Sequence, residues 1–147
     1  MVNKNLLAIK WAELSRRLEQ VRKHRKPTLE GLAADRDATE LIAFNVMLAV
    51  QVCSDVANHL VMDEGWPTPR SAGEAFTRLA EHGVIDRALA DQLRRAVGFR
   101  NLVVHGYAGV DLAPLERAAS QGVDELESFA RAVAAWAQGR GEAEPQH

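Results

Sequence analysis

The chain has 147 residues, which is enough for one domain with a buried core, and its 18 Lys and Arg against 20 Asp and Glu give a formal net charge of −2. This charge excludes a general attraction for nucleic acid, so any RNA contact must come from a local cluster or from dimerisation. The one cysteine, Cys53, excludes an intrachain disulfide and favours a cytoplasmic setting; without a signal pattern or ~18 consecutive uncharged apolar residues, we expect neither secretion nor membrane insertion.

The first predicted helix ends near Lys26-Pro27 and has one apolar face. The residues of that face recur at intervals of four and three, which is the spacing of a buried stripe; they are Leu7, Trp11, Leu14, Leu18 and Val21. A basic run, 22–26, falls in the last turn, where positive charge complements the helix dipole. This run is either a solvated helix end or a contact for an RNA backbone.

The second predicted helix runs from Asp37 to about Asp63, because Asp37 and Glu40 have the spacing of a capping box. Its main stripe is Ile42, Val46, Ala49, Cys53, Val56 and Leu60, and a second apolar face holds Leu41, Phe44, Leu48 and Val52. A helix that is apolar on two faces is buried on two sides. We therefore expect either the central helix of a bundle or half of a dimer interface.

Three further helices are predicted after the loop 65–69. Ser71 and Glu74 form a capping box for a short helix that ends near His82, Asp86 can cap a fourth helix, and Asp111 can cap a fifth. No segment alternates with a period of two residues, so the fold class is all-α, an up-and-down bundle of four or five helices. We expect one domain over 1–137 and a flexible tail over 138–147.

Two side-chain groups have more than one interpretation. Asp55, His59 and Asp63 fall four residues apart on the second helix, so this row either binds a divalent metal or is solvated and salt-bridged. We expect four aromatic residues at helical spacing to be buried in the core rather than to form a platform on which bases stack. They are Trp11, Phe44, Phe129 and Trp136.

The segment 98–109, between the fourth and fifth predicted helices, holds the side chains most suited to phosphate chemistry. Within eight positions lie Arg100, Asn101, His105 and Tyr107. Arginine offers a planar fork of donors to a phosphate, and imidazole exchanges a proton near neutral pH. RNA supplies its own nucleophile, the 2′-hydroxyl, so this chemistry requires no metal or other cofactor. Five residues place Arg100 and His105 about 140° apart on a regular helix. Therefore the helix ends or kinks near Gly106, Arg100 curls round, or a second subunit completes the site.

The structural alternative is that Arg100 and His105 are helix-end residues and Tyr107 is an interface aromatic. However, the segment is similar to the Arg-x4-His-x-Tyr signature of the HepT branch of the HEPN superfamily, with matches at Arg100, His105 and Tyr107. The chain length, the helical layout and the segment 55–60 extend the resemblance over roughly residues 3 to 136.

The resemblance implies a HEPN bundle that dimerises, or forms a higher even oligomer, so that two motifs face one another and cut RNA without a metal. It implies that His105 acts as general base or acid, that Arg100 stabilises phosphate charge, and that Asn101 orients the phosphate or the imidazole. Asp55 is a candidate supporting acid. Arg94 lies four residues before Gly98. It therefore either lines the helix face that holds Gly98, Asn101 and His105, or is simply exposed to solvent.

The resemblance also implies a partner, a minimal nucleotidyltransferase antitoxin that silences the toxin by transferring AMP to Tyr107. The added bulk and negative charge would block the place of an RNA phosphate. The main alternative is a nonenzymatic HEPN module that binds a nucleotide or RNA, or that regulates a nucleotidyltransferase. A purely structural helical adaptor is the third interpretation.

Overall fold

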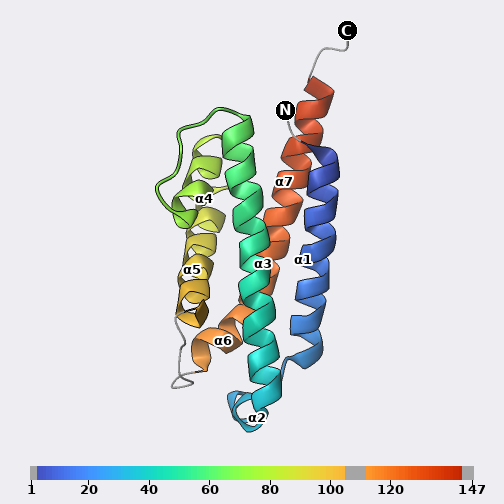
Figure 1. Cartoon of the computed structure of the whole chain (residues 1–147), viewed down its shortest axis with the longest axis vertical. Coiled ribbons are helices and arrows are strands. Elements are labelled where there is room, and N and C mark those ends of the chain that lie inside the picture. The colour runs from blue at the N-terminus through green and yellow to red at the C-terminus, as the bar shows by residue number, and fades with distance from the viewer. Residues whose placement is uncertain (1–2, 105–111, 144–147) are drawn as a thin grey trace.

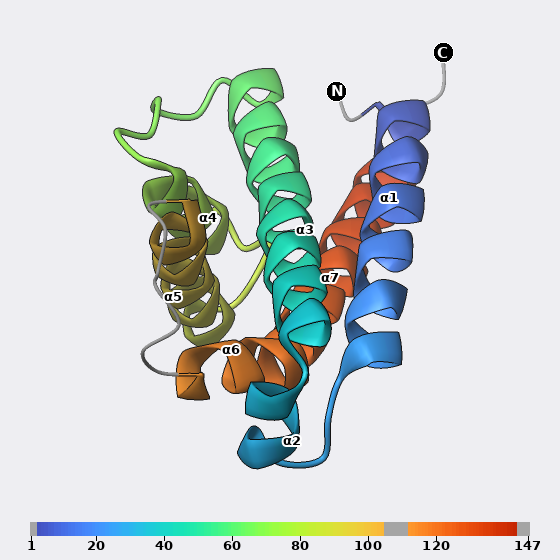
Figure 2. The same ribbon diagram turned by 60° about the horizontal axis from the view of Figure 1, so that its bottom comes forward.

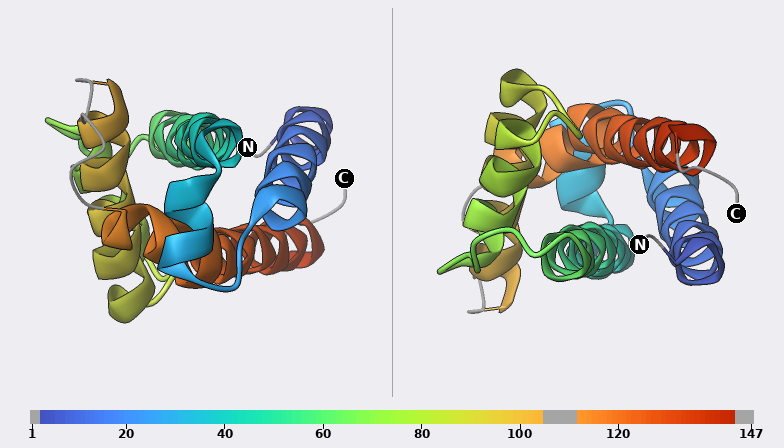
Figure 3. Two further views of the ribbon diagram at one scale, coloured as in Figure 1. Left: turned by 90° about the horizontal axis from the view of Figure 1, so that it is seen from below. Right: turned by 90° about the horizontal axis from the view of Figure 1, so that it is seen from above.

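Three long helices run side by side along the molecule: α1 (Lys4–His24), α3 (Arg36–Asp63) and α7 (Val123–Ala143) (Figure 1). The structure is a computed structural model that describes residues 3–104 and 112–143. On the other side of α3, α4 (Ala72–Glu81) and α5 (Arg87–Val104) form a hairpin that packs against it. Seen from either end, α1, α3, α7 and this hairpin surround one core (Figure 3).

Short elements close one end of the bundle. There α2 (Leu29–Ala34) contacts both α3 and α6 (Ala113–Arg117), and α6 continues through a π-helical turn, η1 (Ala118–Gly122), into α7 (Figure 2). The described residues contain no β-strand. The predicted all-α bundle is therefore confirmed, with α2 and the α6–η1 segment as additions that helical periodicity does not predict.

The predicted main stripe of α3 forms the centre of the core, since every one of its members is buried. Phe129 of α7 lies between Trp11 of α1 and Phe76 of α4, at ring-centroid distances of 6.2 Å and 5.4 Å and nearly perpendicular to both. Edge-to-face contacts of this kind add to the stabilisation from burial. Burial also raises the pKa of the Cys53 thiol, as expected for a structural cysteine.

The second apolar face of α3 is buried only in part, which corrects the prediction for its N-terminal half. Val52 is buried, but Leu41 is 40% and Phe44 49% exposed. The Arg17 guanidinium carbon lies 5.8 Å from the centroid of the Phe44 ring. Phe44 is therefore not a core aromatic, because no helix of the described chain covers this side of α3.

Two of the four predicted caps are confirmed. The Ser71 hydroxyl accepts from the amide of Glu74 at 3.1 Å, and the Asp86 carboxylate accepts from the amide of Leu89 at 2.7 Å. At α3, however, the cap is Asp35, which accepts from the amide of Ala38 at 3.0 Å, and not Asp37. The short helix α2 ends at Ala34, so Asp35 is the one residue between two helices.

The last predicted helix differs from its sequence description. The proposed cap Asp111 lies outside the described residues, and α6 begins at Ala113 without a side-chain cap. Helix α7 continues beyond Gln138, where the sequence predicts that a tail begins, and ends at Ala143. The division into a domain and a tail stays a prediction.

Among the described residues, α3 alone has the length and mean hydropathy, 1.5, of a membrane span, although Asp55 interrupts its uncharged run. In the bundle, 61% of that apolar window is buried. A mostly buried core helix meets the same criteria of length and composition, and its charge-poor sequence follows from that burial.

Candidate active site

The site is built on the C-terminal half of α5. This helix presents Arg100 and Asn101 near its C-terminal end and continues to Val104, the residue before His105. The motif residues His105 and Tyr107, and Gly106 where a kink or helix end is predicted, lie outside the described residues. The structure therefore places the arginine half of the motif.

Two hydrogen bonds fix the guanidinium of Arg100. Its Nη1 donates to Oε1 of Gln51 on α3 at 2.9 Å, and its Nη2 donates to Oδ1 of the neighbouring Asn101 at 3.0 Å. A guanidinium carries five N–H donors, so several remain for a bound anion. Asn101, predicted to orient a phosphate or the imidazole, here holds the arginine.

The polar contacts continue beyond Gln51 across the bundle. Nε2 of Gln51 donates to Oδ1 of Asp55 at 2.9 Å, and the second carboxylate oxygen of Asp55 lies 3.5 Å from Nζ of Lys10 on α1. The Gln51 amide can join these neighbours in only one orientation, because arginine offers no acceptor and a carboxylate no donor. We call this series Arg100, Gln51, Asp55 and Lys10 the Arg100 chain; it joins α5, α3 and α1.

The Arg100 chain gives Asp55 a place near the motif. Asp55 does not contact Arg100 but is two hydrogen bonds away from it, through Gln51. The carboxylate has Lys10 as a counter-ion, so it can accept from Gln51 without being left unpaired. Asp55 can thus influence the arginine by orienting the Gln51 amide.

The row of Asp55, His59 and Asp63 has the salt-bridged arrangement. Nε2 of His59 lies 3.2 Å from Oδ2 of Asp63, whereas Asp55 turns to Lys10 and Gln51. Over residues 3–104 and 112–143, no group of three or more His, Cys, Asp or Glu side chains is arranged to hold a metal. The geometry does not support the interpretation of this row as a metal site.

The other basic candidates lie apart from the Arg100 chain. Arg94 is exposed, and its aliphatic stem lies against Gly73 at the start of α4. In the run 22–26, Arg22 pairs with Glu127, Arg25 with Glu116 and Lys26 with Asp35. These ion pairs support the helix-end interpretation of the run, because three of its four Lys and Arg side chains already have carboxylate partners.

The residue that sequence reasoning missed is Gln51. Its signal is a single amide in an otherwise apolar run of α3, Ala49-Val-Gln-Val-Cys53. A polar residue on such a helix needs a partner or solvent. Its partner is 49 positions away in sequence, so only the packing of α5 on α3 identifies it.

Comparisons with known proteins agree with this fold. The sequence profile of the family described as "Ribonuclease HepT-like" matches residues 14–133. The mRNA nuclease HepT of Shewanella oneidensis is 30% identical over 88 residues, which are 60% of this chain and 66% of that protein. A provisionally named RNase of Archaeoglobus fulgidus is 33% identical over 113 residues, covering 75% of this chain and 82% of that protein.

The solved structures show the same architecture. The tri-AMPylated HEPN toxin of Shewanella oneidensis, in complex with its MNT antitoxin, superposes with a TM-score of 0.83 at 24% identity. The superposition covers 91% of this chain and 99% of the toxin chain.

Proposed function

The chain belongs to the HepT-like ribonuclease family, and we propose that it is the toxin of a toxin–antitoxin pair, a cytoplasmic endoribonuclease that cuts RNA without a metal. The observation that carries this proposal is the Arg100 chain. It holds the Arg100 guanidinium, which has further donors for an anion, five positions in sequence before His105 and seven before Tyr107, the residues that complete the motif. The names of the relatives, an mRNA nuclease and an RNase, agree with this activity.

In the proposed reaction, the 2′-hydroxyl of one ribose attacks the adjacent phosphorus, and the bond to the 5′-oxygen of the next nucleotide breaks. His105 takes the proton of the 2′-hydroxyl or gives a proton to the departing 5′-oxygen. Arg100 donates hydrogen bonds to the non-bridging oxygens, where negative charge grows in the transition state. The products are a 2′,3′-cyclic phosphate and a free 5′-hydroxyl.

A homodimer would complete the site. The exposed face of α3 offers Leu41 and Phe44, and Gln51 follows Phe44 by seven residues, which places both on one side of the helix. Dimerisation over this face would cover the apolar residues and bring the Arg100 chains of two copies toward one another. It would also gather the basic charge that a single chain lacks.

The proposed partner is a minimal nucleotidyltransferase antitoxin that attaches AMP to Tyr107. A phosphodiester on Tyr107 carries a negative charge two residues from His105, so it would repel the RNA phosphate that Arg100 attracts. Silencing would then require no change of fold. The complex of the Shewanella oneidensis toxin with its MNT antitoxin is the parallel.

Expression in growing cells, without the antitoxin, tests this function. We expect growth arrest and RNA decay with the wild type, and neither with Arg100→Ala or His105→Ala, provided that size-exclusion chromatography shows the same dimer for all three proteins. If both variants still arrest growth, the motif is not the active site. If the wild type binds RNA or a nucleotide without cutting, the chain is a nonenzymatic HEPN module instead.

A further inference from the structure

A cavity of about 380 Å³ lies between α5 and the α6–η1–α7 segment. Val46 and Val50 of α3 contribute to its wall. Its volume falls within the ~300–1,000 Å³ of sites for small molecules. No residue of the Arg100 chain lines it, although Phe99 and Val50 in its wall directly precede Arg100 and Gln51. The cavity is therefore a site of its own, built on the same two helices.

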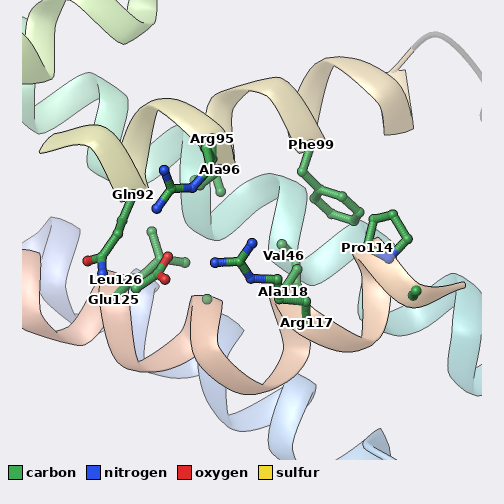
Figure 4. Close-up of a pocket in the computed structure, with 13 residues that line it drawn as sticks. Val46, Gln92, Arg95, Ala96, Phe99, Pro114, Arg117, Ala118, Glu125 and Leu126 are labelled. Atoms are coloured by element: carbon green, nitrogen blue, oxygen red, sulfur yellow. The ribbon is translucent and has the colours of Figure 1, made fainter. Parts of the chain in front are cut away.

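Two arginines extend into this cavity from opposite sides. Figure 4 shows Arg95 of α5 and Arg117 of α6 reaching toward the same space. Within the described chain, Arg95 makes no hydrogen bond or ion pair, and Arg117 uses only its Nε, which donates to Gln121 at 2.9 Å. Two guanidinium groups with unused terminal donors, facing one space, suit an anion that accepts from both.

One carboxylate shares the polar end of the cavity. Glu125 lies there beside Gln92 (Figure 4), and it forms no ion pair with either arginine. Burial raises the pKa of Glu125, while Arg117 and Arg95 oppose that rise. With two arginines and one glutamate, the ionised cavity has a net charge of +1. A ligand anion thus has Glu125 as its competitor for the two guanidinium groups.

The opposite end of the cavity is apolar. The Phe99 ring and Pro114 lie together there (Figure 4). An aromatic ring beside a proline can stack against a flat heterocycle, and nucleic-acid bases are the heterocycles that aromatic side chains commonly stack on. The cavity therefore joins a place for a flat ring to a place for an anion, within one small volume.

We propose that this cavity binds a nucleotide, with the base against Phe99 and Pro114 and the phosphate between Arg95 and Arg117. A phosphate monoester carries a charge of about −1.5 to −2 at neutral pH, which matches two guanidinium groups better than the single charge of a carboxylate does. The nucleotide is either free in solution or one unit of an RNA chain. This site is separate from the RNA-cleaving motif, so nucleotide binding can be absent while the proposed function holds, and can be present while the proposed function fails.

Calorimetric titration of the unmodified full-length protein with AMP tests the proposal. We expect saturable binding, and weaker binding of adenosine, which lacks the phosphate, and of ribose 5-phosphate, which lacks the base. Arg95→Gln and Arg117→Gln should each weaken AMP binding roughly tenfold, the usual cost of losing one charge-assisted hydrogen bond. Glu125→Gln should strengthen it, because the competing carboxylate is gone.

The matched control is Arg131→Gln. Arg131 is an exposed arginine of α7 that bonds to Ser128 and does not line this cavity, so AMP binding should be unchanged. No saturable binding of AMP by the wild type would overturn the proposal, and so would equal binding by the wild type and both arginine variants.

A second titration identifies the source of the nucleotide. It is done in the presence of an RNA oligonucleotide with 2′-O-methyl groups, which cannot undergo attack by its own 2′-hydroxyl. Competition between the oligonucleotide and AMP supports a subsite for one unit of RNA. Undiminished AMP binding supports a separate site for a free nucleotide.

Discussion

Replacing Gln51 with methionine tests whether the Arg100 chain positions Arg100, the arginine that we propose to be catalytic. The Gln51→Met change keeps the length of the side chain but removes both the acceptor for Arg100 and the donor to Asp55. Gln51 is exposed, so water can replace part of the lost hydrogen bonding in the variant. We therefore expect the loss to be the net value of an ordinary hydrogen bond, about 0.5–1.5 kcal/mol, rather than the larger value for hydrogen bonds to charged groups. In the transition state this corresponds to a loss of about 2- to 10-fold in kcat/KM.

The assay is cleavage of a fluorescent RNA substrate, with kcat and KM measured separately. A positioning role predicts that the loss falls mainly on kcat, because the guanidinium acts on charge that develops during the reaction. Stability to urea should change by less than ~0.5 kcal/mol, as for an exposed substitution. Gln138→Met, on the exposed part of α7, is the control and should behave like the wild type.

The opposite change sharpens the test. Gln51→Glu would give Arg100 a carboxylate partner that neutralises it, only four residues from Asp55, so we expect a larger loss than with methionine. If Gln51→Met cleaves RNA as fast as the wild type, the hydrogen bonds of the Arg100 chain do not position the arginine.

Three further predictions concern the fold and its assembly. Phe129→Ala removes a fully buried ring that contacts Trp11 and Phe76, and it should cost about 3–5 kcal/mol in urea unfolding. The hydrogen bond from the Ala38 amide, and after it Lys26, lower the pKa of Asp35 in the folded protein. The ionised carboxylate therefore stabilises the fold at pH values above its ordinary pKa of 3.8, and this stabilisation is lost as the pH falls through the lower pKa of the folded state. The unfolding free energies of the wild type and Asp35→Asn, which keeps a capping oxygen, should therefore differ at pH 7 and converge in strong acid. Phe44→Glu places a charge on the exposed apolar face of α3 and should shift the protein from the proposed dimer to a monomer in light scattering, with little change in helicity.

Each of the three predictions has a result that would contradict it. A cost below ~1 kcal/mol for Phe129→Ala would mean that the aromatic cluster is not packed as described. If the difference in unfolding free energy between the wild type and Asp35→Asn does not depend on pH, the charge of Asp35 does not stabilise the fold. A Phe44→Glu protein that stays dimeric would place the dimer interface elsewhere on the molecule.

Local signals in the sequence predicted much of the fold. Ser71 and Asp86 were identifiable as caps because a cap needs only a side chain and an amide three residues later. The same rule failed for Asp37, because Asp35 has an equivalent spacing and also has Lys26 as a partner. The short helix α2 escaped notice because its six residues show no periodicity, and its stability depends on the burial of Leu32 in the bundle.

The site was predictable only where it is local in sequence. Arg100 and Asn101 stand out because the motif places them together, whereas Gln51 joins them through the packing of α5 on α3. The same holds for the nucleotide cavity. Arg95 and Arg117 face one space only because the π-helical turn η1 and α6 lead the chain back beneath α5.

Metal-independent cleavage is tested most directly with RNA and purified protein in EDTA, with the wild type beside His105→Ala and the product ends analysed. We predict that the wild type alone cuts RNA, leaving 2′,3′-cyclic phosphate and 5′-hydroxyl ends, because the attacking group is the 2′-hydroxyl of the RNA itself. Intact RNA with the wild type, from protein shown by mass spectrometry to carry no AMP on Tyr107, would contradict a metal-independent ribonuclease.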